Sequence, residues 1–314
     1  MTKKKLNLAR SLQPLATRDY RLLFAAVGIE VFGTGVWTIV MVFRVLAIDD
    51  SPLALSAVAT GMSLGLFVFS IFGGVVADRY SKRTIIITVQ GCTAAVMTVI
   101  AVLSLTGTIQ LWQVAVASFA MAAGSTFFFP EASGPSAPEG VTSAWGDLRE
   151  GVKYVLNTRW LLWTLVFGAS LALVIHGPIE VLLPFLTRER FADPEATFGF
   201  LLASYGIGGA IGSLVVSSLR LPRRYLTFML ACWGGGMLLQ RLVPMEMIGR
   251  VASLDFFVSI AFMPVSIAIA GPLSLLVPIP VIFVIAGVVP PLLSVIAIVA
   301  GRMPKTELAR PLDA

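Results

Sequence analysis

The chain has 314 residues, of which 57% are hydrophobic and 13% are charged, and its formal net charge is +6 at neutral pH. Soluble domains carry roughly 25% charged residues, so this composition excludes an ordinary soluble domain. The apolar residues fall in long runs without alternation, which excludes a transmembrane β-barrel, because its strands are alternating segments of about 10 residues.

An α-helix needs about 20 apolar residues to cross the hydrocarbon core of a bilayer. Eight runs of this chain are long enough, and helices are the only spanning form that satisfies their backbone groups. We therefore predict an all-α membrane protein, a polytopic bundle of about eight spanning helices. The runs are Leu22–Ile48, Leu53–Ala77, Thr84–Thr106, Leu111–Phe129, Leu161–Leu186, Phe198–Leu219, Val251–Val277 and Val281–Ala300.

The polar stretch 131–158 divides these runs into two groups of four. It begins with glycines and prolines and becomes amphipathic near Asp147–Leu156, where apolar residues recur at helical spacing. We predict a linker that ends in a helix along the membrane surface. The expected organisation is an N-terminal segment, an N-terminal helical half, this linker, a C-terminal helical half and a tail, at residues 1–21, 22–130, 131–158, 159–301 and 302–314.

The two halves repeat each other weakly. Tyr20–Phe24 opens the first and Arg159–Trp163 opens the second, and a glycine, Gly74 or Gly212, closes the second long run of each. Parallel repeats of this kind are a known transporter architecture, which favours two pseudo-repeated halves. A chance similarity between apolar segments is the alternative.

The stretch Leu226–Leu239 differs from the eight runs. Its helix would reach roughly 21 Å at 1.5 Å per residue, which is short of a hydrocarbon core of about 30 Å. Arginines flank it on both sides, at Arg223, Arg224 and Arg241. We expect a short re-entrant or interfacial segment.

The positions of the basic residues predict the orientation. Cytoplasmic loops of membrane proteins are enriched in Lys and Arg. If the N-terminus lies inside, only Arg44, Arg188 and Arg190 of the 23 basic residues fall at or near the outer face. We therefore expect a multi-pass protein of the inner (plasma) membrane with both termini in the cytoplasm. This asymmetry also explains the positive net charge without a nucleic-acid partner.

The turn after the second run carries a charged motif, Gly73-Gly74-Val75-Val76-Ala77-Asp78-Arg79-Tyr80-Ser81-Lys82-Arg83. Gly74 permits two helices to approach closely. Asp78 at the membrane edge needs a partner, which is either a nearby basic residue or the positive N-terminus of another helix. An ordinary positive-inside turn is the alternative.

This turn resembles the signature loop of the major facilitator superfamily, Gly-x-Leu-Ala-Asp-Arg-x-Gly-Arg-Lys/Arg. Val76 stands for the leucine and Ser81 for the second glycine. The resemblance implies that Asp78 docks on the N-terminus of a late helix, here the one that begins at Gly249–Asp255, and holds the outward-open state. The residues that would form this conformational switch are Gly74, Asp78, Arg79, Lys82 and Arg83.

Later stretches are similar to a bacterial branch of that superfamily, which includes macrolide-efflux-like and enterobactin-exporter-like proteins. They are Leu148–Trp163, Gly177–Pro184, Gly206–Arg224 and Gly249–Pro272. Members have two halves of about six helices each. This chain lacks counterparts of the fifth and sixth helices and of most of the tenth. The antiporter signature of the fifth helix is therefore absent, and the fourth run has no arginine of the proton-relay kind.

Ionisable groups within a bilayer cost about 2.5–3.5 kcal/mol on insertion scales, so each needs a reason. Glu30 lies deep in the first run, as a proton-coupling carboxylate would, but a structural bond to Ser or Thr of a neighbouring helix also explains it. Arg44 is near the outer end of that run, where snorkelling of its side chain to the interface explains a charge at this depth. Two roles are open for the aromatic residues Trp37, Phe43 and Phe67. One is stacking on a bulky ligand, and the other is ordinary packing on neighbouring side chains.

His176 and Glu180 lie four residues apart and share a helix face, and Gly177-Pro178 between them predicts a kink. In the superfamily the first and seventh helices line a central cavity, which implies a shared path for Glu30 and this pair. A structural pair near the outer interface is the alternative.

Asp255 is expected to pair with Arg250 or a neighbour. Gly208-x-x-x-Gly212 is a helix-interface pattern that permits a homodimer.

The sequence lacks the motifs of several enzyme classes. The chain has no phosphate-binding Gly-x-x-x-x-Gly-Lys-Ser/Thr loop, no Gly-x-Ser-x-Gly turn and no His-Glu-x-x-His helix, and it has one histidine. We therefore expect no enzyme activity, no cofactor and no metal. The favoured function is secondary transport, with export of a small amphipathic compound (a drug, siderophore or metabolite) across the lipid bilayer by alternating access. A transport-incompetent remnant or membrane scaffold is the alternative.

Overall fold

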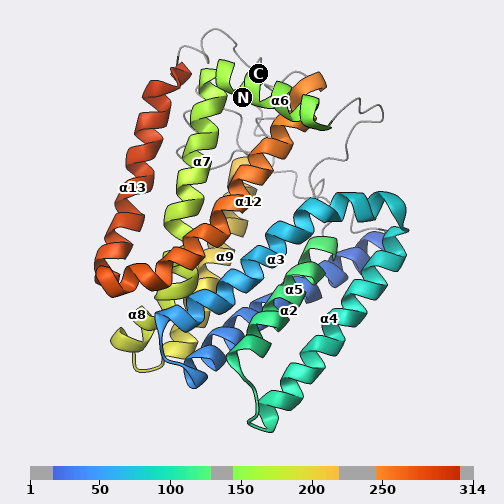
Figure 1. The fold of residues 1–314 in the computed structure, drawn as a ribbon, viewed down its shortest axis with the longest axis vertical. Coiled ribbons are helices and arrows are strands. Elements are labelled where there is room, and N and C mark those ends of the chain that lie inside the picture. The colour runs from blue at the N-terminus through green and yellow to red at the C-terminus, as the bar shows by residue number, and fades with distance from the viewer. Residues whose placement is uncertain (1–16, 129–143, 219–244, 305–314) are drawn as a thin grey trace, which may run out of the picture.

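The computed structural model describes residues 17–128, 144–218 and 245–304 (Figure 1). Every regular element in these ranges is a helix. The first group comprises α2 (Arg18–Ile48), α3 (Pro52–Arg79), α4 (Lys82–Leu105) and α5 (Leu111–Phe128). The second comprises α6 (Ala144–Asn157), α7 (Arg159–Gly177), the π-helical turn η2 (Pro178–Leu182), α8 (Leu183–Arg190), α9 (Pro194–Ser218), α12 (Met245–Leu276) and α13 (Ile279–Ala300).

All eight predicted apolar runs coincide with helices, and α7, η2 and α8 together form the fifth of them. Within the described residues, six segments are long and apolar enough to cross a membrane: 24–48, 52–70, 83–105, 159–190, 257–276 and 279–300. Helices α5 and α9 occupy the two other predicted runs. The prediction of an all-α polytopic membrane protein is confirmed. The predicted re-entrant stretch 226–239 lies outside the described residues.

Helix ends follow local rules. Ser81, which stands where the superfamily motif has glycine, is the N-cap of α4, and its hydroxyl accepts the backbone N–H of Thr84 at 3.2 Å. Asp193 accepts the N–H of Ala196 and so caps α9. Proline begins α3 and α9, where its missing N–H costs nothing.

Helices α3 and α5 pack closely through small residues. A Cβ added to Gly65 of α3 would lie 2.7 Å from the Ala122 Cβ and 2.8 Å from the Phe119 carbonyl oxygen of α5, so these backbones approach closely. The principal core continues along α2 and α3 through Val42, Val45 and other fully buried residues.

The two groups of helices meet where α12 crosses α3 (Figure 1). The Ser56 hydroxyl of α3 donates to the Ile267 carbonyl of α12 at 2.6 Å. Gly271 makes this approach possible, because a Cβ there would lie 2.7 Å from the Ser56 Cβ. A second cluster, which includes Leu161 and Leu165, joins α7 to α13 and to Met303 just beyond it.

The surface helix expected at the end of the linker is α6, which lies across the ends of α7 and α12 (Figure 1). Val155 is buried in the second cluster and anchors it. Val152 and Leu156 stay exposed, which leaves part of its apolar face open. The start of the linker, 131–143, lies outside the described residues.

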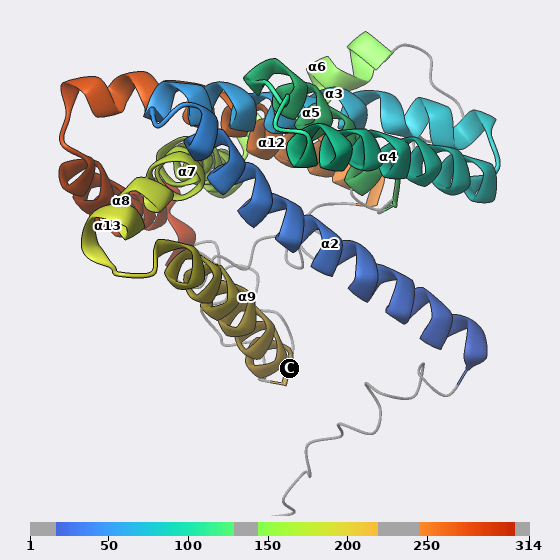
Figure 2. The same ribbon diagram turned by 90° about the horizontal axis from the view of Figure 1, so that it is seen from below.

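Helices α2 and α9 lie to one side of the layer that contains α3, α4, α5 and α12 (Figure 2). Phe43 of α2 and Phe198 of α9 pack edge to face with ring centroids 6.0 Å apart. Among the described elements, α9 otherwise packs on α8.

The turns between helices fall into two sets at opposite ends of the bundle. The α2–α3, α4–α5, α8–α9 and α12–α13 connections lie toward the lower part of Figure 1. Arg188 of α8 and Asp50 of the α2–α3 connection form an ion pair at that end. Arg18, Arg83 and Arg159 lie in the first turns of α2, α4 and α7, and Arg302 follows the end of α13. That this end faces the cytoplasm stays a prediction.

Reporter fusions test this orientation. A fusion partner that is active only in the cytoplasm, joined after Arg302, is expected to be active, because the basic helix ends favour the inside. A fusion in the Arg190–Pro194 connection is the opposite-side control and is expected to be inactive. An active periplasmic reporter after Arg302 would contradict both the orientation and the re-entrant interpretation of residues 226–239.

Candidate functional site

A cleft of about 590 Å³ lies between α2 and α4, with α5 at its base. Its α2 wall is one helix face, because the lining residues Glu30, Thr34, Trp37, Met41 and Arg44 recur at intervals of three and four. The α4 wall follows the same periodicity and carries Gln90, Thr93, Met97, Ile100 and Ser104. Most of the wall is apolar, and polar groups are concentrated in a few positions, as in small-molecule sites.

One end of the cleft holds a carboxylate. The Gln90 side-chain amide donates to Glu30 Oε2 at 2.9 Å, and both residues are half-buried. The sequence suggested a serine or threonine partner for Glu30, and the structure provides a glutamine of α4 instead. This bond holds the Glu30 side chain toward α4 and into the cleft.

The other end holds a guanidinium. Arg44 Nη2 donates to the Ser104 carbonyl of α4 at 3.4 Å, and Arg44 Nε is buried without a hydrogen-bond partner. Snorkelling toward the outer interface was the expectation for Arg44. The structure places its head group on the last turn of α4, and the snorkelling interpretation stays a prediction. Between the two ends, the Trp37 indole Nε1 is also buried without a partner.

The other aromatic candidates pack on aromatic neighbours. Phe67 contacts Phe257 of α12 with ring centroids 5.7 Å apart, and Phe43 contacts Phe198 of α9. Neither phenylalanine lines the cleft. Trp37 is therefore the one of the three predicted aromatic residues that the cleft presents to a ligand.

His176 and Glu180 form a pair on the fifth predicted run. His176 Nδ1 lies 3.0 Å from Glu180 Oε1, and about a third of each side chain is exposed. Glu30 lines the α2–α4 cleft, whereas His176 and Glu180 do not. The shared path expected for the three residues stays a prediction.

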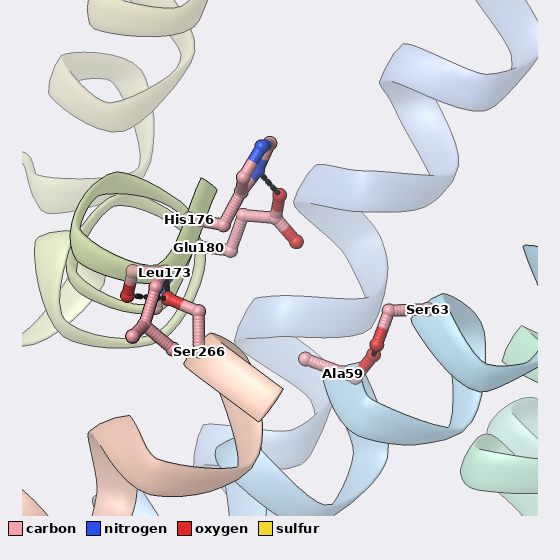
Figure 3. A network of polar contacts seen from close by, with 7 residues as sticks. Ala59, Ser63, Leu173, His176, Glu180 and Ser266 are labelled. Atoms are coloured by element: carbon pink, nitrogen blue, oxygen red, sulfur yellow. Dashed lines mark hydrogen bonds and ion pairs between the residues drawn. The ribbon is translucent and has the colours of Figure 1, made fainter. Parts of the chain in front are cut away.

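Next to this pair, a side chain from α12 enters the backbone of α7 (Figure 3). The Ser266 hydroxyl donates to the Leu173 carbonyl at 2.6 Å and accepts the Gly177 N–H at 2.8 Å. These two groups would bond to each other in an unbroken α-helix. Ser266 thus replaces one rung of the ladder at the predicted Gly177-Pro178 kink, and the π turn η2 follows directly.

The switch motif is only partly described. Residues 71–79 belong to α3, but the surroundings of Gly74 and the side chains of Asp78, Arg79 and Lys82 are not described, and neither is the side chain of Arg250. Arg83 is exposed on the first turn of α4. Asp255, expected near the inner interface, is partly buried on α12.

Within the described residues, no helix covers the glycine face of α9. A Cβ added to Gly206, Gly208, Gly209 or Gly212 would meet no atom within 4 Å, and all four residues are exposed. A face of small residues gains mainly by close packing on another helix. A homodimer through this face stays a prediction.

Replacing both Gly208 and Gly212 with leucine tests it. We expect a shift from dimer to monomer in size-exclusion chromatography with light scattering, because the leucines prevent close approach. The matched control is leucine at Gly287 of α13, which also has no atom within 4 Å of an added Cβ. An unchanged oligomeric state and melting temperature in the double variant would refute the interface.

Residues 9–144 match the family described as transmembrane secretion effector, of the major facilitator type. The matched part includes α2 to α5 and therefore the whole cleft, and it is less than half of the 314 residues. No curated protein and no solved structure matches the chain. The family match supports a membrane transporter of the major facilitator kind rather than an enzyme.

Proposed function

We propose that the chain is a secondary transporter of the major facilitator type that exports a small amphipathic compound by alternating access. The observation that carries the proposal is the cleft between α2 and α4. It lies within two candidate membrane spans, combines apolar walls with polar groups at separate positions, and falls inside the part of the chain that matches a secretion family.

The architecture supports a rocking motion. The first four helices pack on one another through α3 and α5, and the later helices pack through α7 and α12. The α3–α12 crossing joins the two groups, and the His176–Glu180 pair and the Ser266 rung lie beside the π turn of the second. Alternating access in such folds is largely a rigid-body movement of one half against the other.

Accumulation of a panel of drugs and siderophores in an efflux-deficient host tests the proposal. Cells with the chain are expected to retain less of at least one compound than cells without it. Leucine at Gly33, which lines the cleft and has open space, is expected to abolish the difference by filling the cleft. Leucine at Gly168 of α7, which also has open space and lies outside the cleft, is the matched control.

A transport-incompetent remnant or scaffold is the second candidate, and the open glycine face of α9 favours it. A helix whose face of small residues is uncovered lacks the packing that a complete bundle would provide. Unchanged accumulation of every compound, with the chain present in the membrane at normal abundance, would support this candidate and overturn export.

The switch role of Asp78 has its own test. Asp78→Asn is expected to slow transport without preventing membrane insertion, because the carboxylate biases a conformational equilibrium and does not bind substrate. The scale of such coupling is about 1–3 kcal/mol. Initial rates of efflux at matched protein levels measure the effect. Equal rates for the wild type and the variant would contradict it.

A further inference from the structure

The two ends of the α2–α4 cleft carry opposite charges. Glu30 and Arg44 lie on the same face of α2, roughly 20 Å apart along the axis at 1.5 Å per residue. At this distance they do not form an ion pair with each other. Glu30 already accepts the amide of Gln90. Among the described residues, Arg44 has no carboxylate partner, and its bond to the Ser104 carbonyl is long.

The Arg44 end of the cleft offers hydrogen-bond donors that have no acceptor. Arg44 Nε and the Trp37 indole Nε1 are both buried and unpartnered, and both residues line the cleft. A guanidinium and an indole can only donate, so neither group can satisfy the other. Buried donors of native proteins are almost always paired, so each of these two groups calls for an acceptor from the cleft. A carboxylate also supplies the negative charge that Arg44 lacks.

The rest of the cleft suits a hydrocarbon body. Val36, Val40, Met97, Ile100 and Met121 line it, and methionine adapts to irregular apolar ligands. Its volume of about 590 Å³ lies within the range of small-molecule sites, roughly 300–1,000 Å³. The cleft thus combines an anion-binding end with an apolar channel along α2 and α4.

We infer that the cleft binds an anionic amphiphile, with a carboxylate or a similar acidic group on Arg44 and Trp37 and the apolar body between α2 and α4. This inference rests on the proposed function, because it names the class of compound that the transporter carries. An acidic amphiphile from solution and an anionic lipid share this chemistry.

Equilibrium binding to the full-length chain in phosphatidylcholine nanodiscs tests the inference. The probes share one alkyl chain and differ in the head group: dodecanoate, methyl dodecanoate and dodecyltrimethylammonium. We expect dodecanoate to bind about tenfold tighter than either of the others, since a charge-assisted contact to Arg44 is available only to it. Equal or tighter binding of the ester or the cation would overturn the inference.

Substitution of Arg44 identifies the site. Arg44→Gln is expected to weaken dodecanoate about tenfold and to leave the ester unchanged, because only the charge-assisted contact is lost. Arg190→Gln, an exposed arginine at the end of α8 outside the cleft, is the matched control and is expected to have no effect. An Arg44→Gln variant that binds dodecanoate as the wild type does would also overturn the inference.

Trp37→Phe keeps the inference testable if Arg44→Gln does not fold. This variant removes the indole N–H and keeps an aromatic ring, so a several-fold loss is expected for dodecanoate and none for the ester. Equal affinity of the Trp37→Phe variant and the wild type for dodecanoate would count against the site. Phosphatidylglycerol added to the nanodiscs separates the two sources: displacement of dodecanoate supports a lipid occupant, and its persistence supports a free amphiphile.

Binding and transport fail independently in these experiments. A preference for dodecanoate without export of any compound would overturn the proposed transport and leave the binding site standing. Export of a panel compound by a chain that shows no preference among the three probes would overturn the anionic site alone.

Discussion

Gly177→Ala is expected to lower the melting temperature of the detergent-solubilised protein more than any other single methyl addition in α7. A Cβ at this position would lie 2.4 Å from the Ser266 carbonyl oxygen and 2.9 Å from the Ala270 Cβ. Both are far below van der Waals contact, and the first is a backbone atom of α12 that cannot rotate away. Overpacking of this kind costs about 1–3 kcal/mol, occasionally more.

Gly168 on the same helix provides the control, because an added Cβ there meets no atom within 4 Å. Alanine is the better helix former by about 1 kcal/mol, so Gly168→Ala is expected to be neutral or stabilising. The two variants differ only in their surroundings, and their melting temperatures should move in opposite directions. Equal melting temperatures for both would show that α12 does not approach α7 as closely as the structure has it.

Ser266→Ala is expected to have the second large effect. The Ser266 hydroxyl bonds two backbone groups of α7, the Leu173 carbonyl and the Gly177 N–H, and its loss leaves both without a partner. A buried unpaired polar group costs about 1–3 kcal/mol. A lower melting temperature and faster hydrogen exchange of the Gly177 amide are the expected results.

Ser274→Ala is the matched control for this substitution. Ser274 lies on the same helix, but its hydroxyl donates to the Gly271 carbonyl of α12 itself, at 2.7 Å, and not to another helix. Its removal should change the melting temperature little. If Ser266→Ala leaves both stability and Gly177 exchange unchanged, α7 closes its own ladder at this point, and Ser266 is not needed to hold it.

The sequence predicts the elements well because each is a property of one segment. Leu111–Phe129 and Val281–Ala300 were expected from length and apolarity alone, and α5 and α13 begin and end within two residues of these bounds. The surface helix α6 follows from the spacing of its apolar residues. Periodicity within a segment also places His176 and Glu180 on one face, and they lie within hydrogen-bond distance.

The cleft and the helix crossings depend on two segments at once, and the sequence gives no signal for the match between them. Nothing in the pattern of α4 marks Gln90 as the partner of Glu30, which lies sixty residues earlier. In the sequence, Ser266 is one of several serines in an apolar run. Its bonds to the backbone of α7 become evident only when α12 is placed against the end of α7. The distance of Arg44 from the helix end predicts its depth, but it does not identify the Ser104 carbonyl of α4 as its acceptor.

The Ser56–Ile267 bond at the α3–α12 crossing joins residues that are 211 positions apart. Ribosomes add about 5–20 residues per second, so α12 leaves the ribosome about 10–40 s after α3. Individual helices form within about a microsecond, which is negligible on this scale. The first four helices therefore persist with the crossing surface of α3 uncovered until α12 has been made, and the α3–α12 crossing forms only then. Its earliest time is set by translation, and not by the folding of any single helix.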